Sequence, residues 1–234
     1  MPRLRVPLAG IAMAPTSPSS LLLNPALSFC RVDGRHVFLD VARDRYFCLA
    51  GPLDLAFAAM VAGTLDDAAL LARLEDANLL VRSTDGRPLT ACPAAARVSL
   101  VDGPLTAEAK LYPGLFFEMA RARLSLRCRP LETLLHNFRR KKAGCLRQPK
   151  AARDELMIIA HTFARLGLFA TTHDQCLPRS LALALYLASR GHAPELVFGV
   201  RLNPFKAHCW IECHGAIANS RLDEARHYTP VLRV

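Results

Sequence analysis

The chain has 234 residues, of which 52% are hydrophobic, and it carries a formal net charge of +10. This length allows one large domain or two small ones, and the apolar fraction is high enough to exclude wholesale disorder. The sequence contains no run of about eighteen apolar residues, so we expect no membrane-spanning helix. We interpret residues 1–25, rich in Pro, Ser and Ala, as an N-terminal tail rather than a secretory signal.

The eight cysteines are scattered along the chain, and no two of them form a C-x-x-C pair. This spacing does not support a zinc ribbon or a thioredoxin-like site, and disulfide-stapled scaffolds are usually shorter and richer in cysteine. We therefore predict a reduced, cytoplasmic protein without a metal site or a cofactor. Most of its cysteines should be small core residues.

Residues 26–84 predict a small winged-helix-like module. Alternating apolar residues and a hairpin signal at Asp33-Gly34 predict three short strands, at residues 26–32, 35–41 and 46–49. Gly51-Pro52 opens a helix, and Thr64 is the expected N-cap of a second helical stretch that extends through Leu80.

The exposed edge of the third strand, beside the last helix of this module, could accept a peptide as an added strand. The alternative is that the rest of the protein covers this edge. If a peptide binds there, we expect it to contact residues of the strand and of the neighbouring helix, namely Tyr46, Phe47, Cys48, Leu49, Leu71 and Leu74.

Residues 85–107 have the composition of a linker, and residues 108–234 form the second predicted domain. Helical spacing of apolar residues predicts four helices, at 108–126, 130–142, 151–166 and 177–189. Strand patterns follow at 195–202, 207–213, 216–219 and 228–234. The predicted fold class of the whole chain is therefore α+β.

Most of the net charge lies in one segment. Between Arg121 and Lys150 there are ten Lys or Arg residues and one acid, Glu132. This segment is either a solvated basic face or a binding surface for an acidic partner, an anionic ligand or nucleic acid. No nucleic-acid motif accompanies it, so nucleic acid is the partner with the weakest support.

Two residues near the C-terminus form a candidate catalytic pair. Cys176 opens an apolar helix, where the free N–H groups and the helix dipole favour thiolate and could stabilise an oxyanion. His208 lies 32 residues later on a predicted strand. A helix-terminal cysteine followed by a strand-borne histidine is the chain order of papain-like and transglutaminase-like acyl-transfer enzymes.

Several neighbours of this pair have ordinary structural interpretations. Trp210 is expected to pack in the core, and Glu212 to be a structural polar partner. Asp174 and Gln175 either shape an oxyanion hole or cap the helix, and His173 is a weaker candidate base than His208.

The motifs of the C-terminal region resemble the B2-type domain of lasso peptide maturation B proteins. The resemblance rests on Cys-Leu-x-Arg-Ser-Leu-Ala-Leu at 176–183, on Leu196-Val197-x-Gly199-Val200, and on Pro204-Phe205-x-x-His208-x-Trp210-x-Glu212. Residues 26–84 are similar, more weakly, to the B1 part of the same family, the RiPP recognition element. The resemblance implies a leader-binding module followed by a transglutaminase-like (papain-like) cysteine protease domain.

This resemblance also implies roles and partners. Cys176 would be the nucleophile, and His208 the general base and acid. The expected partners are the leader region of a precursor peptide and an ATP-dependent, asparagine-synthetase-like lasso cyclase that receives the linear core. In the family an Asp follows the Asn of the strand after the His, whereas here Ser220 follows Asn219. The third catalytic residue is therefore Asn219, Ser220 or Asp223.

Two alternatives to the leader peptidase stay open from the sequence. The same thiol and imidazole could transfer the acyl group to an amine instead of water. The missing Asp and the basic segment also fit a non-catalytic adaptor that binds a precursor peptide and has a decayed transglutaminase-like domain.

Overall fold

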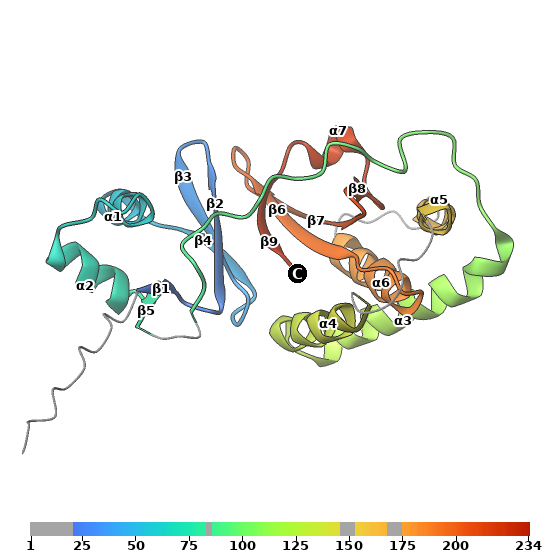
Figure 1. Cartoon of the computed structure of the whole chain (residues 1–234), viewed down its shortest axis with the longest axis horizontal. Helices are drawn as coiled ribbons and strands as arrows, with labels where there is room; N and C mark the ends of the chain where they lie inside the picture. Colours follow the sequence, from blue (N-terminus) through green and yellow to red (C-terminus); the bar gives the residue numbers. More distant parts are fainter. Residues whose placement is uncertain (1–20, 83–85, 146–152, 168–174) are drawn as a thin grey trace, which may run out of the picture.

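The computed structural model describes residues 21–82, 86–145, 153–167 and 175–234, and it is a mixed α+β structure (Figure 1). The small N-terminal region and the C-terminal region each contain a sheet and a group of helices. In Figure 1 the two sheets stand next to each other, with one group of helices at each outer side. Residues 1–20 of the predicted tail lie outside the described residues.

The N-terminal region contains a three-stranded antiparallel sheet of order β2-β3-β4 and two helices. The strands and helices are β2 (Leu27–Val32), β3 (Arg35–Asp40), β4 (Arg45–Cys48), α1 (Gly51–Val61) and α2 (Ala68–Asp76). The three predicted strands and two helical stretches are all present, with boundaries within a few residues of the prediction.

The ends of this region differ from the sequence prediction. Leu22–Leu23 (β1) pairs with Leu80–Val81 (β5) in a short antiparallel sheet, so Leu80 lies in a strand and not in the predicted second helix. The N-cap of α2 is Asp67, whose side chain accepts hydrogen bonds from two backbone N–H groups. Thr64 instead follows α1 and donates its hydroxyl to the carbonyl of Ala59.

The β2-β3-β4 sheet packs against other parts of the chain on both faces. Its helix-facing side carries a cross-strand row of Phe29, Phe38 and Phe47, with the rings of Phe38 and Phe47 stacked 5.1 Å apart. The other side, including Cys30, Val37 and Leu39, belongs to the same apolar cluster as the core of the C-terminal region. In β3 the buried side chains of the two faces form the short apolar run Val37-Phe38-Leu39.

The C-terminal region is a four-stranded antiparallel sheet of order β8-β7-β6-β9 with α6 packed on one face. Its strands are β6 (Glu195–Arg201), β7 (Lys206–Cys213), β8 (Ala216–Ile217) and β9 (Thr229–Arg233). The helical elements are η1 (Ala109–Leu111), α3 (Tyr112–Cys128), α4 (Leu131–Cys145), α5 (Arg153–Gly167), α6 (Cys176–Ser189) and α7 (Leu222–Ala225). The short helix α7 was not predicted, because four residues are too few to show a helical pattern.

The segment predicted as a linker is held against both sheets. Cys92 N–H donates to the carbonyl of Phe29 in β2, over 3.4 Å. Farther along, Leu100 N–H donates to the carbonyl of Ile217, and Ile217 N–H donates to the carbonyl of Val98, each over 2.8 Å. The segment thus extends the edge of the larger sheet at β8, and it crosses from one sheet to the other (Figure 1).

A buried polar contact fixes α6 on β7. Ser180, fully buried in α6, donates its hydroxyl to the carbonyl of Cys209 over 2.8 Å. The same hydroxyl accepts a hydrogen bond of 2.9 Å from the side-chain amide of Asn219, whose oxygen accepts from the backbone N–H of Ile211. A buried hydroxyl with both roles satisfied specifies one position of the helix on the sheet.

Part of the basic segment is occupied by contacts within the chain. Lys141 donates to the carbonyl of Leu185, and Lys142 pairs with Glu195. Arg127, Arg129 and Arg140 are exposed. Among the described residues, no helix is both long and apolar enough to cross a membrane.

Because one face of the β2-β3-β4 sheet packs into the core of the C-terminal region, we predict that the two regions unfold together. Leu39→Ala removes a side chain that is 1% exposed on the face toward the C-terminal region. We expect it to lower the free energy of unfolding by about 2–5 kcal/mol. Leu55→Ala, at a residue 73% exposed on α1, is the matched control, and it should change that free energy by less than about 0.5 kcal/mol. Differential scanning calorimetry should show one transition that shifts as a whole; separate transitions, with only one displaced, would contradict shared folding.

Candidate active site

Cys176 is the first residue of α6, at the end of the helix that faces β7. Its thiol is half-buried and lies against backbone N–H groups of Leu177, of Cys209 and of its own residue. Burial raises the pKa of the thiol, and these N–H groups lower it. The N–H groups at this helix start are the kind of donors that stabilise a developing oxyanion.

His208 is on β7, directly before Cys209, opposite Gly199 of β6. Its ring packs between Trp210 and Tyr228, with centroid distances of 5.8 and 5.1 Å. Gly199 leaves the room for this arrangement, because a Cβ there would lie 2.6 Å from the Trp210 ring. The aromatic neighbours hold the imidazole in one orientation.

The Nε2 atom of His208 faces the hydroxyl of Ser220 at 3.2 Å. Ser220 is buried, and it donates that hydroxyl to the carboxylate of Glu224 over 3.1 Å. The other carboxylate oxygen of Glu224 lies 3.9 Å from Nε2 itself. Imidazole, hydroxyl and carboxylate therefore form a continuous polar chain.

The start of α6 meets β7 next to His208, since the Cys176 thiol contacts the backbone N–H of Cys209, the residue after His208. No hydrogen bond joins the two side chains in the described part of the chain. Burial lowers the pKa of His208, and the negative charge of Glu224 opposes that shift. With the pKa of the thiol raised and that of the imidazole lowered, both groups are neutral at neutral pH. Catalytic contacts of this kind often tighten only when substrate binds.

The structure distinguishes the three candidates for the third residue. Ser220 touches the imidazole. Asn219 bonds to Ser180 and to the backbone of Ile211 and has a packing role instead. Asp223 lies in α7, not in a loop, where it is exposed and paired with Arg221 at 3.2 Å. Neither Asn219 nor Asp223 contacts His208.

Glu224 is the charged residue that sequence reasoning missed. It reaches the site because α7 begins at Leu222 and turns the chain so that the Glu224 carboxylate accepts the hydroxyl of Ser220, which lies just before the helix. The spacing Ser-x-x-x-Glu is visible in the sequence, but it carries this meaning only if the segment is helical.

The residues around the pair otherwise behave as expected or lie outside the described residues. Trp210 is fully buried and donates its Nε1–H to Glu212 over 2.9 Å, which confirms both structural interpretations. Gln175 does not cap α6 with its side chain, and its amide oxygen accepts a hydrogen bond from Arg123. His173 and Asp174 lie outside the described residues.

The residues predicted to bind a peptide do not form one surface: some lie on an edge strand, one is half-buried on a helix, and two are buried in the core. β4 is an edge strand of its sheet, with Phe47 directed toward the helix side and Tyr46 toward the C-terminal region. Leu71 is half-buried on α2. Leu49 and Leu74 are buried in the core below the helices, so neither lies on a surface that a peptide could contact.

Tyr46 connects the edge strand to the candidate site. Its ring lies 5.6 Å from that of Phe205, in the hairpin between β6 and β7, three residues before His208. Burial raises the pKa of the Tyr46 phenol, and the nearby Cys209 and Cys176 contribute to that increase.

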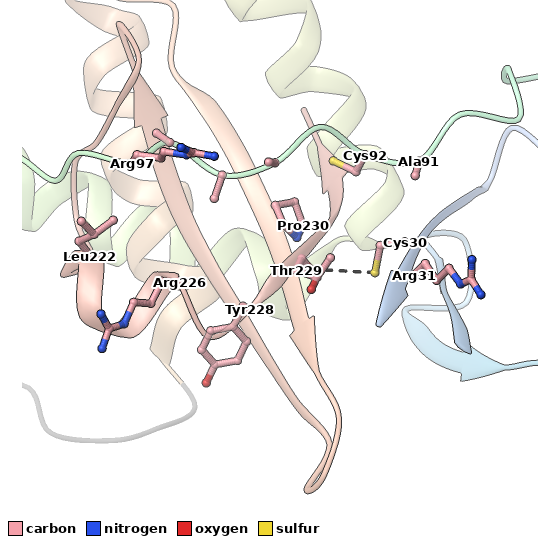
Figure 2. Close-up of a pocket in the computed structure, with 13 residues that line it drawn as sticks. Cys30, Arg31, Ala91, Cys92, Arg97, Leu222, Arg226, Tyr228, Thr229 and Pro230 are labelled. Atoms are coloured by element: carbon pink, nitrogen blue, oxygen red, sulfur yellow. Dashed lines mark hydrogen bonds between the residues drawn. The ribbon is translucent and has the colours of Figure 1, made fainter. Parts of the chain in front are cut away.

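A cavity of about 610 Å³ adjoins the site (Figure 2). Cys30 and Arg31 of β2 line one end, and Arg97 and Arg226 lie toward the other, with the segment 91–97 running along it. Cys30 donates its thiol to the carbonyl of Thr229 across the contact between the two regions. The cavity meets the site at Tyr228, which lines it and packs against His208.

The family comparison agrees with this geometry. Residues 119–233 match the model of the transglutaminase-like superfamily. The C-terminal half of the chain therefore contains a transglutaminase-like core domain, of a superfamily whose members are typically cysteine-dependent enzymes. The comparisons with curated proteins and with solved structures gave no match.

The polar chain from imidazole to carboxylate predicts a specific pH profile for alkylation of Cys176 by iodoacetamide. Glu224→Gln removes the negative charge that raises the pKa of His208, so the acid limb of the rate profile should move to lower pH. The rate at neutral pH should fall about tenfold, because the ring loses a hydrogen-bonded charge that orients it. Ser220→Ala should give a similar loss of rate.

Asp223→Asn is the matched control, since it neutralises the neighbouring carboxylate on the same short helix, which makes no contact with the imidazole. Peptide mapping by mass spectrometry would separate the alkylation of Cys176 from that of the other cysteines. A profile for Glu224→Gln that superimposes on that of Asp223→Asn would eliminate the role of Glu224.

Proposed function

We propose that this protein is a leader peptidase of lasso peptide maturation. It would bind the leader of a precursor peptide through its N-terminal region and release the core by thiol acyl transfer. The observation that carries the catalytic part is a helix-terminal thiol against the backbone N–H of Cys209, the residue after His208, together with the contact of the His208 imidazole with Ser220 and Glu224. The transglutaminase-like core supports a cysteine-based transferase or protease activity.

The reaction would proceed in two steps. His208 removes the proton of the Cys176 thiol as the sulfur attacks the carbonyl carbon of the scissile amide. The imidazolium then returns the proton to the leaving amine, the C–N bond breaks, and a thioester remains on the enzyme. Water, deprotonated by the same imidazole, hydrolyses the thioester and restores the thiol. Glu224 would stabilise the imidazolium through the Ser220 hydroxyl.

The link between β4 and the site supports a coupled recognition and cleavage function. A leader added along the edge of β4 would run beside Tyr46, whose ring contacts the hairpin that precedes His208. Binding there would raise the local concentration of the cleavage site near Cys176, so the catalytic cleft itself needs little affinity for the peptide.

The Ser220–Glu224 pair favours an active enzyme over a decayed adaptor. The adaptor hypothesis rests on the missing Asp after Asn219 and on the basic segment. A carboxylate is nevertheless present 3.9 Å from the imidazole, supplied by Glu224 of α7. The same acyl-enzyme gives hydrolysis if water attacks it and amide transfer if an amine attacks it.

A cleavage assay tests the catalytic proposal. The full-length protein, mixed with the precursor peptide encoded beside its gene, with and without the cyclase, should release the leader as followed by mass spectrometry. Cys176→Ala should release none, and Glu224→Gln should release it about 10–100-fold more slowly. Asp223→Asn should behave as the wild type. Incorporation of an added amine into the product would instead assign amide transfer, and no release by the wild type despite leader binding would indicate an adaptor.

A binding assay tests the recognition surface separately. Leu71→Ala trims a half-buried side chain of α2 that the sequence assigns to peptide binding, and it should weaken binding of a fluorescent leader peptide about tenfold. Leu55→Ala makes the same chemical change on the exposed side of α1 and should leave the affinity unchanged. Equal affinities of the two variants, measured by anisotropy with matched melting temperatures, would exclude this face of α2 as the leader site.

A further inference from the structure

Three metal-ligating side chains meet at the end of the larger sheet that lies away from His208. They are Cys213, the last residue of β7, His214 in the turn before β8, and His192 in the connection between α6 and β6. The Cys213 sulfur and one nitrogen from each imidazole all lie within 4.8 Å of one another. The two imidazole rings are nearly perpendicular, with centroids 5.8 Å apart.

His192 is the unusual member of this group. It is 1% exposed, and neither of its ring nitrogens has a hydrogen-bond partner among the described residues. A buried polar group without a partner destabilises the fold, so such groups are rare unless an ion or water satisfies them. Its backbone is fixed, because its N–H donates to the carbonyl of Leu187 at the end of α6.

We propose that Cys213, His192 and His214 form a binding site for Zn²⁺. Zinc prefers thiolate and imidazole ligands in tetrahedral geometry, at about 2.0–2.3 Å from the metal. Ligand atoms within 4.8 Å of one another need only small side-chain rotations to converge on one ion. Three protein ligands leave a fourth position for water.

The surroundings of the three ligands fit this site. Metal-bound histidines usually direct their second ring nitrogen at a carboxylate, and Glu155 Oε2 lies 3.8 Å from Nε2 of His192. Zinc binding would replace the proton of the Cys213 thiol, which passes to the solvent as the S–Zn bond forms.

A bound ion would cross-link separate segments of the fold and take no part in the proposed thiol chemistry. Its ligands join the connection that follows α6 to the β7–β8 hairpin, and Glu155 adds the first turn of α5. Sequence spacing did not reveal it, because the ligands lie 21 residues apart and form none of the usual paired zinc motifs.

Cobalt substitution tests the proposal directly. The untagged full-length protein carries Cys176→Ala, so that the candidate active site does not contribute a thiolate ligand. Addition of Co²⁺ should produce a thiolate-to-cobalt charge-transfer band and the visible bands of a tetrahedral ion, saturating at one equivalent. Zn²⁺ should displace the cobalt, and one proton should be released for each ion bound.

Ligand variants in the same background identify the site. Cys213→Ala should abolish the charge-transfer band, and His214→Ala, at an exposed turn, should weaken Zn²⁺ binding at least about 100-fold. Cys128→Ala and His227→Ala are exposed controls that should bind as the Cys176→Ala parent does. Zn²⁺ at a hundredfold excess over its dissociation constant should raise the melting temperature by roughly 5 °C in the parent and not in Cys213→Ala.

Two results would overturn the proposal. One is the absence of a charge-transfer band in the Cys176→Ala parent. The other is a band that persists in both His214→Ala and Cys213→Ala with unchanged affinity. Because His214 is exposed, its variant remains informative even if Cys213→Ala fails to fold.

Discussion

The candidate active site depends on the buried hydrogen bond from Ser180 to the carbonyl of Cys209. This bond fixes α6 on β7, and the same helix carries Cys176 at its start while the same strand carries His208 next to Cys209. Asn219 completes the contact from the segment that leads to Ser220. One buried hydroxyl thus sets the relative positions of the thiol, the imidazole and the residues behind the imidazole.

A second constraint comes from the polar chain behind His208. In the sequence, Ser220 stands where the resembling family has Asp, and a serine alone lacks the charge that stabilises an imidazolium. The structure supplies that charge from Glu224, which reaches the same hydroxyl because α7 follows immediately. The carboxylate side chain is 55% exposed, so its influence on His208 is partly screened by water and operates mainly through the buried Ser220.

The sequence was most informative where local patterns decide the structure. The Asp33-Gly34 turn, the apolar strands around it and the helix opened by Cys176 all follow from short-range chemistry, and the structure contains them. It was least informative where distant residues decide. The pairing of β1 with β5, the exposure of Asp223 and the burial of Leu49 and Leu74 depend on packing between segments, which single-sequence periodicity does not encode. Glu224 was missed for this reason, since its role requires α7.

The small sheet, packed on both faces, has a consequence for how a bound peptide would be handled. A recognition domain on a flexible linker can move relative to the catalytic cleft. Bonds at many distances from the bound segment of the peptide can then be cleaved. Here the edge strand and the hairpin that carries His208 are parts of one packed body, joined through Tyr46 and Phe205. The distance from a peptide held on β4 to Cys176 would therefore be fixed. The number of residues between the anchored segment of the peptide and the cleft would then select the bond that reaches Cys176.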